Sequence, residues 1–229
     1  MTKFRSDTPR VSSPATIAAL RRWEGRGSRP LLISIALAFV LSACATPSGV
    51  AVPAITEPAI SAAYLPLSGR IHLGLDKAAG AAMVIAPGVA VTNAHNSNLL
   101  DDKLVIGKAG QSDLLFFRTP GTQPPATAIP TVGEAVNAYG QDLDGKLRLA
   151  HGVVSQIVMV PGFDSSPYFI FAGDAGPGFS GGPVVDPAGK LIGITFGYKD
   201  QGKKRLIYAY DMARVRAEFS RLQNTPPRR

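Results

Sequence analysis

Short apolar runs separated by glycine and proline dominate the chain from about residue 64 to residue 210. The runs are shorter than ordinary helices, and many alternate apolar with polar positions, which is the periodicity of a strand. Ten such runs occupy residues 81–86, 88–94, 103–107, 113–118, 135–140, 151–158, 168–173, 181–186, 190–197 and 205–210. Many brief strands with turn residues between them predict an all-β sandwich or barrel.

One helix is predicted, at residues 212–222. Asp211 directly precedes it and can cap it, because its carboxylate can accept hydrogen bonds from the free N–H groups of the first turn. Apolar residues recur at helical spacing and share one face. They are Met212, Val215, Phe219 and Leu222. We expect this face to dock on the strands rather than on a membrane.

A different pattern occupies residues 1–43. An apolar run, residues 31–41, follows Arg21, Arg22, Arg26 and Arg29. This arrangement is typical of a secretory signal peptide, and the run is shorter than the roughly 20 residues of a membrane span. The segment also carries a surplus of five positive charges, which leaves only +3 of the net charge of +8 for the remainder. The basic composition therefore does not indicate a nucleic-acid partner.

The only cysteine, Cys44, ends the motif "LSAC" at residues 41–44. The motif resembles the lipobox of bacterial lipoproteins, which implies a lipid on Cys44 and removal of residues 1–43. The alternative is a free cysteine behind a failed signal. Lipidation would make a membrane a partner, and Ala45 after the cysteine implies the outer membrane, facing the periplasm, in a cell with two membranes. A lone cysteine cannot form an intramolecular disulfide, so packing must hold the domain together.

Residues 44–63 are rich in proline, alanine and serine and show neither helical nor strand periodicity. This composition predicts a tether between the lipid and the folded part. The folded domain is therefore expected to occupy residues 64–229.

One serine, Ser180, stands within "GPGFSGGP", residues 176–183. A serine hydroxyl becomes a useful nucleophile only when a base takes its proton and a third group orients that base. The candidate bases are His72, His95 and His151. Taken alone, Ser180 could equally be a turn residue among glycines.

Three blocks of sequence give these residues a common context. They are "VTNAH" ending at His95, "DLLFFR" beginning at Asp113, and "GPGFSGGPVVDPAGKLIGI" at residues 176–194. In this order they resemble the catalytic blocks of the trypsin-like (chymotrypsin-fold) serine proteases. The nearest branch is the bacterial one that includes periplasmic heat-shock proteases and glutamyl endopeptidases.

The resemblance implies two antiparallel six-stranded β-barrels with a boundary near residues 120–131, and a hydrolase that needs no metal or cofactor. It implies His95 as general base, Asp113 as its orienting carboxylate and Ser180 as nucleophile. The backbone N–H groups of Gly178 and Ser180 would form the oxyanion hole. Gly178 suits that place because a residue without Cβ lets the backbone turn its N–H into the site.

The separation of Asp113 from His95 is short for the family, which implies that a hairpin of the first barrel is trimmed. Asp101 or Asp102 could replace Asp113. The sequence also departs from the animal enzymes at Phe179, where they carry an aspartate that pairs with a newly cut N-terminus. The site is therefore expected to assemble without a cut, or on ligand binding.

The substrate pocket is less defined. Asp174 lies six residues before Ser180, at the spacing of the acid on the floor of the trypsin pocket, although a structural role for Asp174 is favoured. Thr195, Phe196 and Gly197 are expected to border the pocket and to pair with the substrate backbone. Cleavage specificity, physiological substrate and oligomeric state stay open.

The resulting hypothesis is a lipid-anchored serine endopeptidase that acts on peptide or protein substrates among exported proteins. Two alternatives belong to other classes. One is a catalytically silent module that binds peptides or an envelope partner in the same cleft. The other is a structural lipoprotein whose barrels are only a scaffold.

Overall fold

The computed structural model describes residues 48–71, 76–120, 123–159, 167–202 and 204–224. The strands are β1 (Val50–Ala51), β2 (Tyr64–Ile71), β3 (Asp76–Ala86), β4 (Val89–Thr92), β5 (Val105–Lys108), β6 (Leu115–Arg118), β7 (Ala135–Gln141), β8 (Leu147–Val158), β9 (Tyr168–Gly173), β10 (Pro183–Val185), β11 (Leu191–Gln201) and β12 (Lys204–Asp211). The helices are α2 (Pro58–Ala63), the 3₁₀ turns η1 (Ala94–Leu99) and η2 (Asp102–Leu104), and α3 (Met212–Asn224). Within these residues, none of the helices combines the length and the apolar character needed to span a membrane.

The strand predictions are confirmed, because each of the ten apolar runs overlaps one of the strands β3 to β12. The C-terminal helix is confirmed as α3, and the Asp211 carboxylate accepts a hydrogen bond from the Arg214 N–H at 2.7 Å, as a capping residue should. Strand β2 was not predicted. Its sequence contains Pro66, Ser68 and Gly69, which interrupt the alternating pattern.

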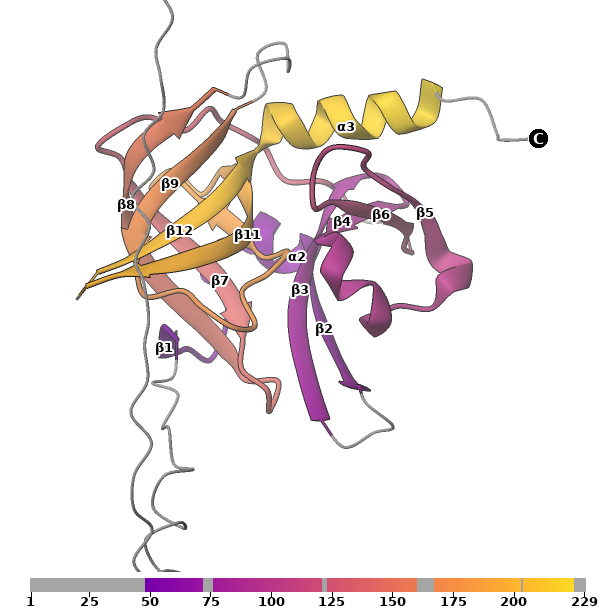
Figure 1. The fold of residues 1–229 in the computed structure, drawn as a ribbon, viewed down its shortest axis with the longest axis horizontal. Helices are drawn as coiled ribbons and strands as arrows, with labels where there is room; N and C mark the ends of the chain where they lie inside the picture. The colour runs from indigo at the N-terminus through magenta and orange to yellow at the C-terminus, as the bar shows by residue number, and fades with distance from the viewer. Residues whose placement is uncertain (1–47, 72–75, 121–122, 160–166, 203, 225–229) are drawn as a thin grey trace, which may run out of the picture. The chain divides into compact units, whose positions relative to one another are not determined.

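The C-terminal strands form a closed barrel of six strands (Figure 1). Their order is β8–β7–β10–β11–β12–β9, and β9 pairs back with β8 to close the ring. All neighbours are antiparallel. Apolar side chains that point inward, including Phe169, Phe171 and Ile192, are fully buried and fill the barrel. The short strand β1 adds to β8 outside this ring.

The N-terminal strands form a second antiparallel sheet in the order β2–β3–β4–β6–β5. The resemblance implies six strands here, but this sheet has five, and its edge strands β2 and β5 do not pair in the described part of the chain. The cause is the short segment between His95 and Asp113, which leaves room for only β5 between η2 and β6. The trimmed hairpin was thus correctly predicted.

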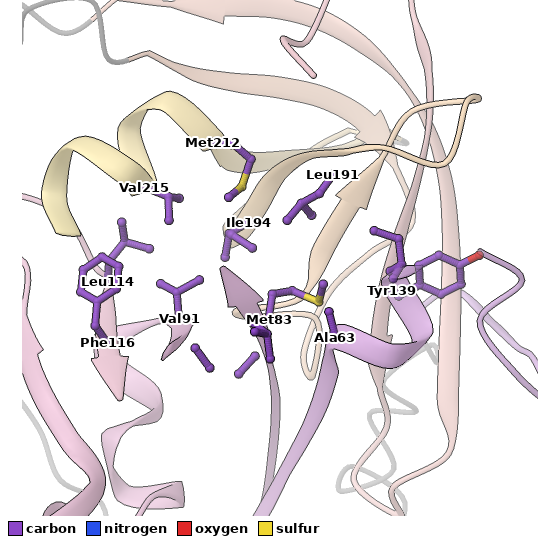
Figure 2. Packing of buried hydrophobic residues seen from close by; sticks show 14 of the residues in the cluster. Ala63, Met83, Val91, Leu114, Phe116, Tyr139, Leu191, Ile194, Met212 and Val215 are labelled. Atoms are coloured by element: carbon purple, nitrogen blue, oxygen red, sulfur yellow. The ribbon is translucent and has the colours of Figure 1, made fainter. Parts of the chain in front are cut away.

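One apolar core joins the two sheets and α3 (Figure 2). Met83 and Phe116 of the N-terminal sheet share it with Ile194 of the barrel and Val215 of α3, and all four are fully buried. Further along α3, the ring of Phe219 packs on Phe116 with 5.1 Å between centroids. The apolar face of α3 therefore covers the strands, as predicted.

The prediction of a tether is wrong for the part of this segment that the structure describes, from Ser48 onward. Val50 and Ala51 pair with β8, and the side chain of Ile60 on α2 is fully buried. Glu57 accepts a hydrogen bond from the Tyr139 hydroxyl at 2.7 Å. Residues 48–63 consequently belong to the compact unit that begins at Thr46. Their burial depends on distant partners, which local composition does not reveal.

The packing of α2 predicts a stability effect that a tether would not have. We expect Ile60→Ala to lower the free energy of unfolding by about 2–5 kcal/mol, because it removes a fully buried side chain. The matched control is Ile129→Ala, whose side chain is 81% exposed, with an expected change within about 0.5 kcal/mol. Urea denaturation measures both, and equal values for the two variants would contradict the assignment.

Candidate functional site

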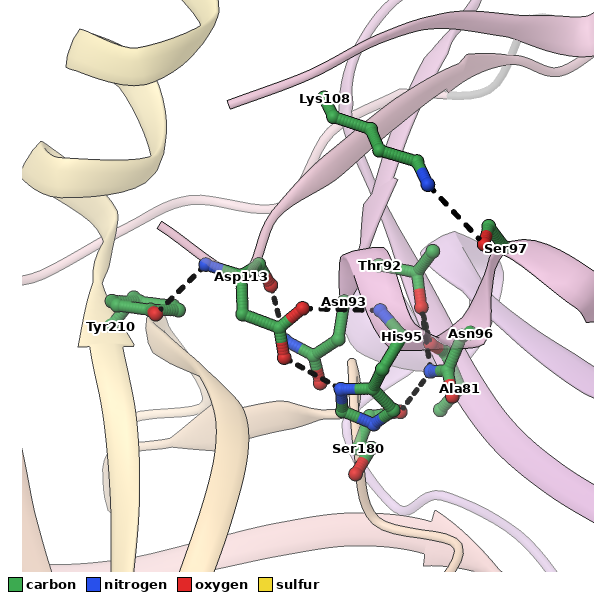
Figure 3. Close-up of polar contacts among 10 residues, drawn as sticks. All are labelled: Ala81, Thr92, Asn93, His95, Asn96, Ser97, Lys108, Asp113, Ser180 and Tyr210. Atoms are coloured by element: carbon green, nitrogen blue, oxygen red, sulfur yellow. Dashed lines mark hydrogen bonds and ion pairs between the residues drawn. The ribbon is translucent and has the colours of Figure 1, made fainter. Parts of the chain in front are cut away.

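His95 and Asp113 form the centre of the candidate site (Figure 3). β4 ends at Thr92, and η1 then carries His95 with its side chain about half exposed. The His95 Nδ1 atom lies 2.5 Å from Asp113 Oδ2, and the His95 backbone N–H donates to Asp113 Oδ1 at 3.1 Å. One carboxylate therefore contacts both the ring and the backbone of the same histidine, which restricts how the ring can turn.

Asp113 is held by its backbone from both halves of the unit. Its carbonyl accepts hydrogen bonds from Asn93 Nδ2 at 2.9 Å and from the Ala94 N–H at 3.3 Å. Its N–H donates to the hydroxyl of Tyr210, on β12 of the barrel, at 3.0 Å. Burial raises the pKa of the Tyr210 hydroxyl, so this group stays neutral.

A buried polar network on α3 fixes the residue before Asp113. The Ser112 hydroxyl donates to Glu218 at 2.8 Å and accepts from Arg214 Nε at 2.9 Å. Arg214 and Glu218 are only 4% and 3% exposed, and they form an ion pair at 3.2 Å. Glu218 also pairs with Arg221 at 3.6 Å, and Arg214 donates from Nη2 to the Gln111 carbonyl oxygen at 3.2 Å. The network therefore ties the loop before β6 firmly to the helix.

Ser180 belongs to the barrel, and its carbonyl connects it to the N-terminal sheet. This carbonyl accepts hydrogen bonds from the Ala81 N–H at 2.8 Å and from Asn96 Nδ2 at 3.1 Å. Asn96 directly follows His95 on η1, so the contact brings the two candidate residues together. In Figure 3, Ser180 lies on the side of the His95 ring that points away from Asp113. No hydrogen bond joins the Ser180 hydroxyl to His95 among the described contacts, and such bonds are often long before substrate binds.

The glycines around Ser180 are required by close backbone approaches. Gly178 has φ of +88°, and a Cβ atom there would lie 1.8 Å from the carbonyl oxygen of Gln141. Gly181 has φ of +81°, and its Cβ would lie 2.0 Å from the carbonyl oxygen of Ala81. Side chains are excluded at both positions. The backbone of this loop is therefore tightly constrained.

Among the predicted pocket residues, Thr195 is buried, whereas Phe196 and Gly197 are partly exposed. Thr195 is only 2% exposed, and its hydroxyl donates to the carbonyl oxygens of Phe179 and Gly182, so it supports the Ser180 loop instead of facing a pocket. A β-bulge lies between Thr195 and Gly197. Space is open around the Gly197 Cα, where an added Cβ would meet no atom within 4 Å.

Phe196, the extra residue of this bulge, belongs to an aromatic cluster. Its ring stacks on Tyr210 with 4.0 Å between centroids and meets the edge of Tyr168 at 5.9 Å. Tyr208 completes the cluster, 6.0 Å from Phe196. Because Tyr210 also binds the Asp113 backbone, the cluster lies directly beside the His95–Asp113 pair.

Other candidates from the sequence lie elsewhere. Asp174 is exposed and so gives no floor for a buried pocket, and its backbone carbonyl oxygen accepts the Gly49 N–H. Asp101 caps η2 by accepting from the Lys103 N–H, so Asp113 and not Asp101 or Asp102 accompanies His95. His151 contacts Asn137 on the neighbouring strand. His72 and Cys44 lie outside the described residues.

The roles of Asn96, Tyr210 and the pair Arg214 and Glu218 were not predicted from the sequence. The position of Asn96 next to His95 could have suggested a role. Tyr210 and the ion pair gave no such signal, since their partners lie about a hundred residues earlier in the chain.

Comparison with known proteins identifies a family and a fold. Residues 78–194 match the family model described as a trypsin-like peptidase domain. No curated protein sequence matches the chain. Among solved structures, the active form of the Rv3671c protease from M. tuberculosis aligns with a TM-score of 0.60 at 19% identity, covering 80% of this chain and 92% of that one. An inactive mutant form of Rv3671c also scores 0.60 at 17% identity, covering 80% and 99%.

A further structural match is the HtrA-type protease AlgW with tripeptide. It has a TM-score of 0.54 at 18% identity, and the alignment covers 72% of this chain and 60% of that one. At these identities the solved structures establish the fold.

The bond between Asp113 and Tyr210 leads to a testable prediction. Tyr210→Phe keeps the ring stack but removes the acceptor of the Asp113 N–H, so we expect the free energy of unfolding to fall by about 1–3 kcal/mol. Tyr208→Phe is the control, because its ring lies in the same cluster and its hydroxyl does not bind Asp113. Urea denaturation at neutral pH compares them, and an unchanged value for Tyr210→Phe would refute the role assigned to this hydroxyl.

Proposed function

The chain belongs to the trypsin-like peptidase family, and from this premise we propose that it is a serine endopeptidase with Ser180 as nucleophile. The bond between His95 Nδ1 and Asp113, at 2.5 Å, is the observation that carries the proposal. It leaves the other ring nitrogen, Nε2, available to a hydroxyl on the opposite side, where Ser180 lies.

The proposed reaction proceeds through a covalent intermediate. Nε2 of His95 takes the proton of the Ser180 hydroxyl as its oxygen attacks the carbonyl carbon of a peptide bond. His95 then gives this proton to the leaving amine, and an acyl group stays on Ser180 until water, activated by the same ring, removes it. Asp113 holds the ring and stabilises its positive charge while the proton is on it.

The negative charge that develops on the substrate oxygen needs fixed donors. In the proposal these are the backbone N–H groups of Gly178 and Ser180. Neither N–H has a hydrogen-bond acceptor within the described part of the chain. One such donor contributes roughly 3–4 kcal/mol to the transition state in enzymes of this type.

Peptide substrates suit the free edge of β11. β10 pairs with β11 only as far as Ile194, and residues 196–201 have β12 as their single described neighbour. An extended peptide can add to such an edge through main-chain hydrogen bonds. The tripeptide named with AlgW supports a peptide as the ligand class.

A peptide-binding module without activity is the second candidate, favoured because the contacts of the described residues include no hydrogen bond between the Ser180 hydroxyl and His95. Labelling of the full-length protein with a fluorophosphonate probe separates the two. We expect labelling of the wild type, none for Ser180→Ala, and a rate lower by about a thousandfold for His95→Gln. Ser155→Ala, a serine substitution on β8, should label like the wild type. Absence of Ser180-dependent labelling would exclude the peptidase and leave the silent module.

Exported proteins are the proposed substrates, because the lipobox-like motif at Cys44 supports a protein anchored by lipid in the cell envelope. The proposed place is the outer membrane, facing the periplasm, where the cell has two membranes. Two or more acyl chains bind a membrane far more firmly than one.

The anchor has its own test. The wild type should incorporate radiolabelled palmitate and lose residues 1–43, whereas Cys44→Ser should do neither, because the modified cysteine marks the cleavage point. Gel migration and membrane fractionation measure this. Normal shortening of the Cys44→Ser precursor would contradict lipidation and leave the peptidase proposal intact.

A further inference from the structure

The first described residues of the unit form an extended arm, residues 48–52, along the outside of the barrel. Val50 and Ala51 pair with Leu149 and Arg148 of β8, and the Val52 N–H donates to the Leu147 carbonyl oxygen at 3.1 Å. Arg148 in turn donates from Nε to the Ser48 carbonyl oxygen at 3.2 Å. The arm is therefore held along its whole length by β8.

The same arm reaches the loop that precedes Ser180, residues 174–179. The Gly49 N–H donates to the Asp174 carbonyl oxygen at 3.0 Å. Gly49 has φ of +64°, and a Cβ atom there would lie 2.9 Å from Cζ of Phe179. The Phe179 ring, only 2% exposed, thus packs directly against the bare backbone of the arm. Phe179 is the residue immediately before Ser180.

Arg205 on β12 fastens the arm to the loop. Its Nη1 atom donates to the Ser48 hydroxyl and to the Ala175 carbonyl oxygen, both at 3.3 Å. Its Nε atom donates to Asp200 at 2.7 Å, and the guanidinium lies over the Tyr198 ring at 4.6 Å. These contacts fix the orientation of the guanidinium, so that it binds the arm and the loop at the same time.

We propose that the arm is a positioning element for the oxyanion hole, with Arg205 as its clamp. The inference rests on the proposed function. The loop has neither a disulfide nor an acidic residue at position 179 to hold it, and the arm supplies backbone, apolar and Arg205-mediated contacts in their place. The arm does this as an uncut part of the chain, so severing it from the domain would switch the site off.

The closing experiment compares two glycines with the same backbone conformation. Gly49 and Gly202 have φ of +64° and +61°, so the backbone strain of an alanine is similar at both positions. A Cβ at Gly49 would lie 2.6 Å from the Leu149 carbonyl oxygen of β8 and 2.9 Å from Phe179 Cζ, whereas a Cβ at Gly202 meets nothing within 4 Å, so only Gly49→Ala displaces the arm from β8 and from the loop. In the full-length protein, we expect Gly49→Ala to lower the maximal rate of fluorophosphonate labelling about tenfold or more, and Gly202→Ala to stay within about twofold. The probe concentration at half-maximal rate should not change, because the oxyanion hole acts on the transition state.

Arg205→Met is the second variant and decides the matter if Gly49→Ala does not fold, with exposed Lys204 on the same strand giving the control Lys204→Met. Circular dichroism establishes folding. Folded Gly49→Ala or Arg205→Met that labels at the wild-type maximal rate would overturn the arm proposal alone. A wild type that shows no Ser180-dependent labelling would overturn the proposed function and the arm proposal with it.

Discussion

The two hydrogen bonds to the Ser180 carbonyl are the contact on which the candidate site depends. Ser180 belongs to the barrel and His95 to the other sheet, so their distance is set by how the two halves meet. The donors, Ala81 N–H and Asn96 Nδ2, both come from the half that carries His95. Thr92 extends the connection, because its hydroxyl accepts from Asn96 and donates to the Ala81 carbonyl oxygen. The apolar core stabilises the packing of the two sheets, and the polar contacts fix the position of one sheet relative to the other.

Asp113 shows how a short segment can still place a carboxylate correctly. The sheet that carries it has lost a strand, which shortens the support from its own half. Tyr210 and the Ser112–Arg214–Glu218 network replace that support from β12 and α3. The C-terminal helix α3 therefore stabilises the position of Asp113, which lies in the N-terminal half of the unit.

The sequence pattern predicted those features that depend on residues close together in the chain. The ten apolar runs, the cap at Asp211 and the glycine at position 178 follow from periodicity and backbone geometry within a few residues. The placement of Ile60, Gly49 and Tyr210 was not predictable in this way, because each acquires its role from residues far away in sequence. Thr195 illustrates the same limit: its place in the strand at residues 190–197 was predicted, but the contacts of its hydroxyl with Phe179 and Gly182 of the Ser180 loop were not.

The network around Asp113 also bears on the synthesis of the protein. A growing chain contains His95, Asp113 and Ser180 well before the ribosome reaches Glu218. Until then the Asp113 N–H lacks its Tyr210 acceptor and Ser112 lacks both of its charged partners. In the proposed peptidase, Asp113 therefore gains its full support only after the last helix has packed, so Ser180 becomes reactive late in folding.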